Sequence, residues 1–157
     1  MQLIGSSQTA PPPGFSFDNA IAAIDCLDLS KAKNRLMLSS PRGKNWSTEE
    51  AAIAEKWYKR FLILCAKYPD RTLIPSVLID EVWHQHVLDT RQYPQDCQTI
   101  FGEFIHHDPY FGSTEEGAKR LEILFQETND LFRTEFGEDC LTAEPLADLR
   151  AVAQSCK

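Results

Sequence analysis

Apolar residues recur every three or four positions along most of this chain, which is the spacing of one face of an α-helix. The clearest such segment begins at Ser47 and continues to Tyr68. Ser47 and Glu50 have the spacing of a capping box, in which two side chains satisfy free amides at the start of a helix. The apolar stripe that follows consists of Ala54, Trp57, Tyr58, Phe61, Leu64, Cys65 and Tyr68. This pattern predicts a long helix with one buried face.

The segment before this helix has less regular apolar spacing. Asp18 can cap a first helix, and its apolar positions are Ile21, Ile24, Ala32 and Leu36. Asp25 and Asp28 could mark a break inside it. A Ser-Pro-Arg-Gly turn at residues 40–43 then ends the element.

Two more helices are expected in the middle of the chain. One begins at about Pro75, because proline suits the first helical position, and extends to Asp89 or Thr90. The next begins at Pro94, which pushes the backbone of Tyr93 away from the helical region. The buried face of this helix consists of Cys97, Ile100, Phe101 and Phe104.

The following segment combines a turn with a second long helix. An Asp-Pro pair favours extended backbone, so residues 106–112 are expected to form an ordered turn region. Ser113 and Glu116 have the spacing of a second capping box. The apolar stripe after them predicts a helix that ends at Gly137.

These patterns predict an all-α protein, a single compact domain of about five helices that form an irregular bundle. Residues 1–14 contain three consecutive prolines and are expected to form a flexible N-terminal arm. The helical domain then spans residues 15–137. The tail, residues 138–157, has apolar spacing that permits a short helix.

Composition narrows the possible partners of this domain. The chain has 157 residues, 43% of them hydrophobic, which is enough for a substantial core. Its net charge of −7 argues against a broad grip on nucleic acid or anionic lipid, since both require basic patches. No run of about 18 apolar residues is present, so no membrane span is expected. A small molecule or another protein remains the expected kind of partner.

The five cysteines do not suggest a disulfide framework or a zinc ribbon. They are odd in number, widely spaced and never form a Cys-x-x-Cys pair. The first residues also lack the basic and apolar regions of a secretory signal. These features together predict a protein of the reducing cytoplasm.

All four histidines lie in two short segments, and these are the best candidates for chemistry. On a helix, His84 and His86 point about 200° apart, so one small site cannot take both. Asp80 and His84 are i, i+4 neighbours on one face. His86 and Asp89 are i, i+3 neighbours on another. Each helical histidine is therefore expected to have its own carboxylate, which is the usual arrangement behind a metal ligand or a general base.

His106 and His107 form the second segment. In extended backbone, neighbouring side chains point to opposite sides, so one of the two could meet the helical histidines. One helix histidine, one turn histidine and one or two carboxylates suit zinc, iron or manganese, with a position open for water. The preferred set is Asp80, His84 and either His106 or His107, and His86 is the remaining candidate ligand.

Two other interpretations of the histidines stay open. The helix around Trp83 is otherwise apolar, so the imidazoles could form a buried hydrogen-bonded network in which Trp83 is a core residue. Metal-free acid–base chemistry is the other alternative. No nucleophile elbow, phosphate loop or dinucleotide fingerprint is present, so no nucleotide cofactor is expected.

Three further residues near the histidines have structural explanations. Cys97 could be a nucleophile with His84 or His86 as its base, but its place in an apolar stripe favours core packing. Tyr93 could cover the corner between two helices and donate its hydroxyl. Asp96 could cap free amides there.

The Trp-His-Gln-His segment at residues 83–86 is followed by Tyr93, the Asp96-Cys97 pair and Phe101-Gly102. This pattern resembles the glycine-rich domain-containing protein-like family over roughly residues 18–111. The resemblance implies that these histidines belong together with the tyrosine, the aspartate and the cysteine, but it implies no established reaction or ligand. Larger relatives carry the domain beside a glycine-rich region. With seven glycines, this chain is expected to be a stand-alone version.

The sequence thus predicts a metal-binding protein that could be a metal-dependent enzyme. The alternative is a non-catalytic protein-interaction module whose histidines form a buried structural network.

Overall fold

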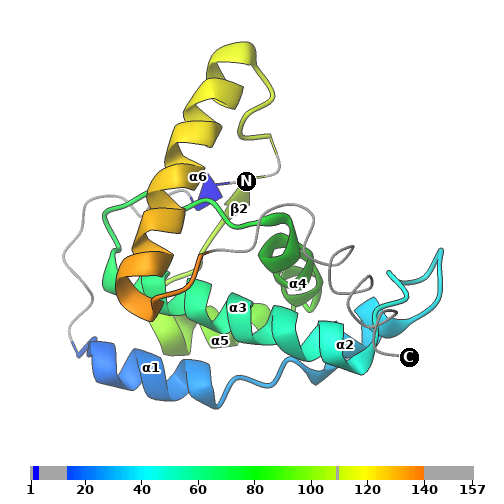
Figure 1. Ribbon diagram of the computed structural model, residues 1–157. Helices are drawn as coiled ribbons and strands as arrows, with labels where there is room; N and C mark the ends of the chain where they lie inside the picture. Colours follow the sequence, from blue (N-terminus) through cyan, green and yellow to red (C-terminus); the bar gives the residue numbers. More distant parts are fainter. Residues whose placement is uncertain (1, 4–13, 109, 140–157) are drawn as a thin grey trace.

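The computed structural model describes residues 2–3, 14–108 and 110–139 (Figure 1). The helices in these ranges are α1 (Phe17–Asp25), α2 (Ser30–Met37), α3 (Thr48–Lys67), α4 (Val77–Leu88), α5 (Tyr93–Phe101) and α6 (Glu115–Phe136). The strands described there are two residues long each, β1 (Gln2–Leu3) and β2 (His107–Asp108). The predicted all-α class is therefore confirmed. None of the described helices is long and apolar enough to cross a lipid bilayer.

The long helix α3 runs through the middle of the molecule (Figure 1). It contacts α1, α2 and α4, and α5 packs against α1 and α4. The side chains of Tyr58, Phe61 and Leu64 on α3 are fully buried. Together with Ile79 and Val82 of α4, they belong to one hydrophobic core. The apolar stripe expected on this helix is thus the surface on which the other helices assemble.

The start of α3 has the predicted capping box. The Ser47 hydroxyl accepts a hydrogen bond from the Glu50 amide at 3.1 Å, and the Glu50 carboxylate accepts one from the Ser47 amide at 2.7 Å. A cap of this kind stabilises a helix by about 1 kcal/mol.

The first predicted helix is in fact two helices, so the described part of the chain contains six helices rather than five. The break lies where Asp28 was expected to disrupt the pattern, and the Asp28 carboxylate accepts a hydrogen bond from the Ser30 amide at 2.9 Å. This local bond competes with helical pairing. The expectation that Asp18 caps the first helix is wrong, because the helix begins at Phe17, after Ser16.

The predicted starts of α4 and α5 shift by one or two residues. Helix α5 also ends at Phe101, so the expectation that Phe104 lies on its buried face is wrong: Phe104 lies beyond the helix and is 44% exposed. Ser76, rather than Pro75, stands at the start of α4, and its hydroxyl accepts a hydrogen bond from the Ile79 amide. Helix α5 begins at Tyr93, one residue before Pro94. The cap formed by the Ser76 side chain therefore sets the start of α4, rather than the preference of proline for the first helical position.

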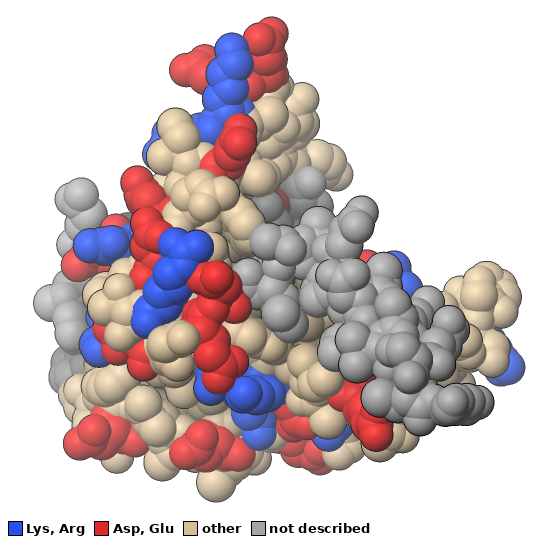
Figure 2. Space-filling model, viewed as in Figure 1, with Lys and Arg blue, Asp and Glu red and all other residues tan. Residues whose placement is uncertain are grey.

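Helix α6 begins one residue later than predicted. Thr114 is its N-cap and accepts a hydrogen bond from the Gly117 amide, so the expected box of Ser113 and Glu116 is wrong. The helix ends at Gly137, as predicted, where φ is 68°. Its first half extends beyond the other helices (Figure 1), and Figure 2 shows acidic and basic side chains interspersed along it.

The second half of α6 is anchored in the core. The Thr128 hydroxyl accepts a hydrogen bond from the Ile74 amide at 3.0 Å and donates one to the Leu124 carbonyl. The ring of Phe132 packs 5.3 Å from that of Trp57 on α3. These contacts attach α6 to α3 and to the segment that leads into α4.

The segment before α6 contains the extended backbone expected from its Asp-Pro pair. Strand β2 pairs antiparallel with β1, so that His107 lies opposite Leu3 and Asp108 opposite Gln2. The expected arm and tail fall mostly outside the described residues, at positions 4–13 and 140–157. The division into arm, helical domain and tail stays a prediction.

Candidate metal centre

Asp80, His84 and His107 come together at the exposed side of α4. Asp80 and His84 lie one turn apart on the helix, and β2 brings His107 against them. The Nδ1 atom of His84 is 3.2 Å from Asp80 Oδ2, and the Nε2 atom of His107 is 3.4 Å from Asp80 Oδ1. One ligand atom from each of the three residues lies within 4.8 Å of the other two. Two separate parts of the chain thus contribute to one group.

These distances suit a small metal ion. Ligand atoms at 2.0–2.1 Å from a tetrahedral zinc ion are roughly 3.3 Å apart. The two carboxylate–imidazole distances are close to that value. His84 Nδ1 also lies 2.9 Å from the Asp80 carbonyl oxygen. If Nδ1 carries the proton, it donates to that carbonyl oxygen, and Nε2 is the nitrogen that can bind a metal. In the other tautomer, Nδ1 is the metal-binding nitrogen.

The ring of His107 is held by its neighbours. It lies 4.7 Å from the Trp83 ring and 4.4 Å from the His84 ring, in both cases edge to face. The His107 side chain is 7% exposed, whereas that of Asp80 is 23% and that of His84 is 44% exposed. The group is therefore buried on one side and open to solvent on the other, so a bound ion could also take a water molecule.

Burial shifts the ionisation of this group. It raises the pKa of Asp80, while the nearby His84 and His107 lower it in part. Burial lowers the pKa of His107, and the neighbouring His84 lowers it further, against the opposite effect of Asp80. The net shift favours the neutral imidazole of His107, which is the form that binds metals. A cation would stabilise the partly desolvated Asp80 carboxylate.

Of the five candidate metal ligands, two lie outside this group. His106 is exposed, and its ring packs 4.8 Å from that of Phe104. Thus His107, and not its neighbour, contacts Asp80 and His84. His86 lies on a different face of α4, where it is 5% exposed.

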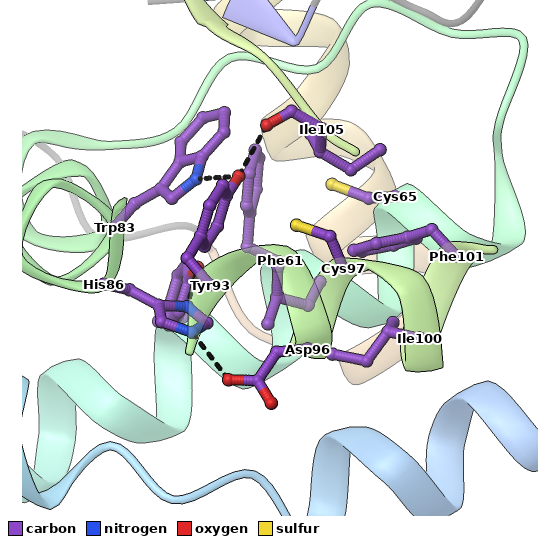
Figure 3. Close-up of a pocket in the computed structure, with 12 residues that line it drawn as sticks. Phe61, Cys65, Trp83, His86, Tyr93, Asp96, Cys97, Ile100, Phe101 and Ile105 are labelled. Atoms are coloured by element: carbon purple, nitrogen blue, oxygen red, sulfur yellow. Dashed lines mark hydrogen bonds and ion pairs between the residues drawn. The ribbon is translucent and has the colours of Figure 1, made fainter. Parts of the chain in front are cut away.

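His86 belongs to a second, buried group that joins three helices (Figure 3). Its Nδ1 atom is 2.9 Å from the hydroxyl of Tyr58 on α3, and its Nε2 atom is 3.0 Å from Asp96 Oδ2 on α5. The other oxygen of Asp96 accepts a hydrogen bond from Gln92 at 2.8 Å. The Asp96 carboxylate therefore binds two side chains, rather than capping free backbone amides as expected.

The expected pairing of His86 with Asp89 is wrong. Asp89 is the C-cap of α4, where the backbone has left the helical region, and it acts on His86 only through its charge, which raises the pKa of that imidazole slightly. Its carboxylate pairs with Lys31 at 2.8 Å instead. Asp96 takes its place because α5 packs against α4.

The protonation of the buried group follows from its surroundings. Burial lowers the pKa of His86, although Asp96 opposes this shift. Burial raises the pKa of Tyr58 well above its ordinary value. Tyr58 therefore stays protonated and donates to a neutral His86, which donates from Nε2 to Asp96. Both ring nitrogens of His86 are used inside the protein. Tyr58 was not identified as a partner from sequence because it lies 28 residues away.

Tyr93 has the corner role that the sequence suggested. Its hydroxyl donates a hydrogen bond to the Ile105 carbonyl at 2.7 Å and accepts one from Trp83 Nε1 at 3.0 Å. Burial raises its pKa, so the hydroxyl remains a donor. Trp83 is 1% exposed and is a core residue, as expected.

Cys97 is a poor nucleophile in this setting. Its side chain is buried, and burial raises the pKa of its thiol, so little thiolate is present at pH 7. It lines a small cavity with Cys65, Tyr93 and His86 (Figure 3), and the cavity volume is about 10 Å³. A space of that size holds at most about one water molecule. Core packing is therefore the role that its position supports.

Comparisons with known proteins place the histidine region within a family. A family model described as UCP032817-like matches residues 26–131. Glycine-rich domain-containing proteins 1 and 2 of Arabidopsis thaliana are each 30% identical to this chain over 84 residues. The alignment covers 51% of this chain and 10% of each relative, so the chain corresponds to a small part of these longer proteins. No solved structure matches the chain significantly.

Proposed function

The chain belongs to the UCP032817-like family, a family of glycine-rich domain-containing protein-like sequences, and we propose that it binds one divalent transition-metal ion. The proposed ligands are Asp80, His84 and His107. The observation that carries this proposal is the meeting of ligand atoms from α4 and β2 within 4.8 Å of one another. Two imidazoles and one carboxylate suit zinc, iron or manganese.

Three protein ligands would leave at least one coordination position for water or substrate. Sites of that kind are typical of metalloenzymes, whereas structural zinc sites use four protein ligands. The half-exposed His84 ring supports access from solvent. A bound ion would act as a Lewis acid or activate water for attack. We therefore infer that the protein could be a small metal-dependent enzyme.

The test is the metal content and zinc affinity of matched variants. Purified protein should contain close to one metal ion by elemental analysis after growth with added zinc, iron and manganese. His84→Ala and His107→Ala should lose the ion, while His106→Ala, a change in the adjacent exposed residue, should keep it. Equal zinc affinities for His106→Ala and His107→Ala in calorimetry would overturn the assignment.

The alternative is a non-catalytic interaction module with a structural histidine network. The observation in its favour is the burial of His86 between Tyr58 and Asp96. The relatives also support it, because the matched segment is 10% of a much longer protein. Under this alternative, His86→Ala lowers the unfolding free energy. No purified form contains stoichiometric metal. A pull-down recovers a protein partner whether or not chelator is present.

We also propose a cytoplasmic location without binding to nucleic acid. Cys26, Cys65 and Cys97 are free thiols, which suits a reducing compartment. The net charge of −7 disfavours a polyanionic partner. Fractionation of the native host, and a gel-shift assay at low salt, would test the two statements.

A further inference from the structure

We propose that Tyr93 is a positioning residue for the metal centre, and that its hydroxyl determines that His107 rather than His106 faces Asp80 and His84. This inference rests on the proposed metal site. Tyr93 itself contacts none of the three proposed ligands through its hydroxyl. It acts through the backbone and the neighbouring indole.

The first step of the argument is the pair of bonds at the Tyr93 hydroxyl (Figure 3). The hydroxyl accepts a hydrogen bond from Trp83, on the helix that carries Asp80 and His84, and donates one to the carbonyl of Ile105. Ile105 lies two residues before His107. One oxygen atom thus joins the two segments that supply the ligands.

The second step is the alternation of side chains in the segment that follows Ile105. In extended backbone, a shift of one residue moves every side chain to the opposite side. Such a shift would turn His106 toward Asp80 and His107 toward solvent. The bond from Tyr93 to the Ile105 carbonyl opposes this shift because it fixes the segment two residues before His107. The Trp83 ring, 4.7 Å from His107, adds a second restraint on the same choice.

The third step is that Tyr93 is itself firmly held. Its ring lies 4.9 Å from the ring of His86 and 5.3 Å from that of Phe104, edge to face in both cases. The side chain of Tyr93 is 3% exposed. The buried group around His86 therefore supports the residue that orients the exposed group.

The chain provides a matched pair of variants to test this role. Tyr93→Phe and Tyr58→Phe each remove one buried hydroxyl and keep an aromatic ring of the same size. We expect Tyr93→Phe to weaken zinc binding about tenfold, the lower end of the effect of residues that orient metal ligands. Tyr58→Phe should leave zinc affinity within about twofold of the original protein, because its hydroxyl binds His86. The visible spectrum of bound cobalt should change in Tyr93→Phe alone.

Equal effects of the two variants on affinity and spectrum would overturn the positioning role. A second measurement separates this inference from the proposed function. In metal-free protein, the rate at which diethylpyrocarbonate modifies His107, read by mass spectrometry, should rise several-fold in Tyr93→Phe and not in Tyr58→Phe. If no form binds zinc, the proposed function fails, and the modification rates alone decide the role of Tyr93. Unchanged His107 reactivity in Tyr93→Phe would then refute it.

Discussion

Two histidines two residues apart on α4 lie in opposite environments. His84 belongs to what we call the outer centre, with Asp80 and His107, and its side chain is 44% exposed. His86 belongs to the inner centre, with Tyr58 and Asp96, and is 5% exposed. Both nitrogens of His86 have protein partners. The outer histidines instead share one carboxylate, and the exposed His84 ring leaves the outer centre open to solvent.

This difference indicates a division of roles. A buried polar group that is fully hydrogen-bonded fixes the packing of the elements that carry it. A partly exposed set of ligand atoms with an open side can bind something from solution. The inner centre therefore stabilises the packing of α3, α4 and α5. The outer centre is the proposed metal site.

The largest expected effect comes from removing the carboxylate of the outer centre. Asp80→Ala removes the group that both His84 and His107 contact, so zinc affinity should fall on the order of a thousandfold, about 4 kcal/mol. The unfolding free energy of the metal-free protein should change by about 1 kcal/mol or less, as for most partly exposed positions. Calorimetric titration and urea unfolding measure the two quantities. A large loss of stability with zinc binding intact would reverse the proposed roles.

The next effect should come from the inner centre, with the opposite pattern. His86→Ala leaves Tyr58 and Asp96 without their buried partner and creates a cavity, which should cost about 3 kcal/mol of unfolding free energy. Urea unfolding with chelator present tests this value. Zinc affinity at a temperature where the variant is folded should fall by no more than about tenfold, because the His86 ring is one of the contacts that hold Tyr93. A loss as large as in Asp80→Ala would show that the centres do not act separately.

A smaller effect is expected from pH on the metal-free protein. Burial lowers the pKa of His86 in the folded state below the value of about 6.5 for an exposed histidine. Between these two pKa values the unfolded chain binds more protons, so the stability associated with neutral His86 is complete above about pH 6.5 and decreases as the pH falls. His86→Gln should show a shallower decrease in unfolding free energy between pH 7 and pH 5. Identical slopes would mean that His86 does not contribute.

The smallest effect concerns the cysteines beside the inner centre. Burial raises the pKa of Cys97 and of Cys65, and both are inaccessible, whereas Cys26 is exposed. Iodoacetamide should label Cys26 at least about tenfold faster than the two buried thiols in the folded protein. Peptide mass mapping over time provides the rates. Rapid labelling of Cys97 would indicate that the inner centre opens readily.

The sequence predicted the outer centre better than the inner one. The relation of Asp80 to His84 follows from helical geometry alone. The choice of one histidine from His106 and His107 follows from alternation in extended backbone, although the sequence did not say which one. Both are local rules, and both apply in the structure.

The inner centre depends on packing between helices that are far apart in sequence. Tyr58 precedes His86 by 28 residues, and Asp96 follows it by ten. Helical periodicity places Tyr58 on a buried face, but it does not show what the hydroxyl meets. Spacing along the helix points to Asp89, but this residue is the C-cap of α4 and its carboxylate pairs with Lys31. Similarly, the break after α1 depends on a local bond of Asp28 that periodicity could only suggest.

The most direct test of the central claim is anomalous diffraction at the zinc edge from crystals of the zinc-loaded protein. The account predicts one strong peak bonded to Asp80, His84 and His107, with each ligand atom about 2.0–2.1 Å from the metal. A peak bonded to His86 or His106 instead, or crystals with no ordered zinc at saturating concentration, would contradict it.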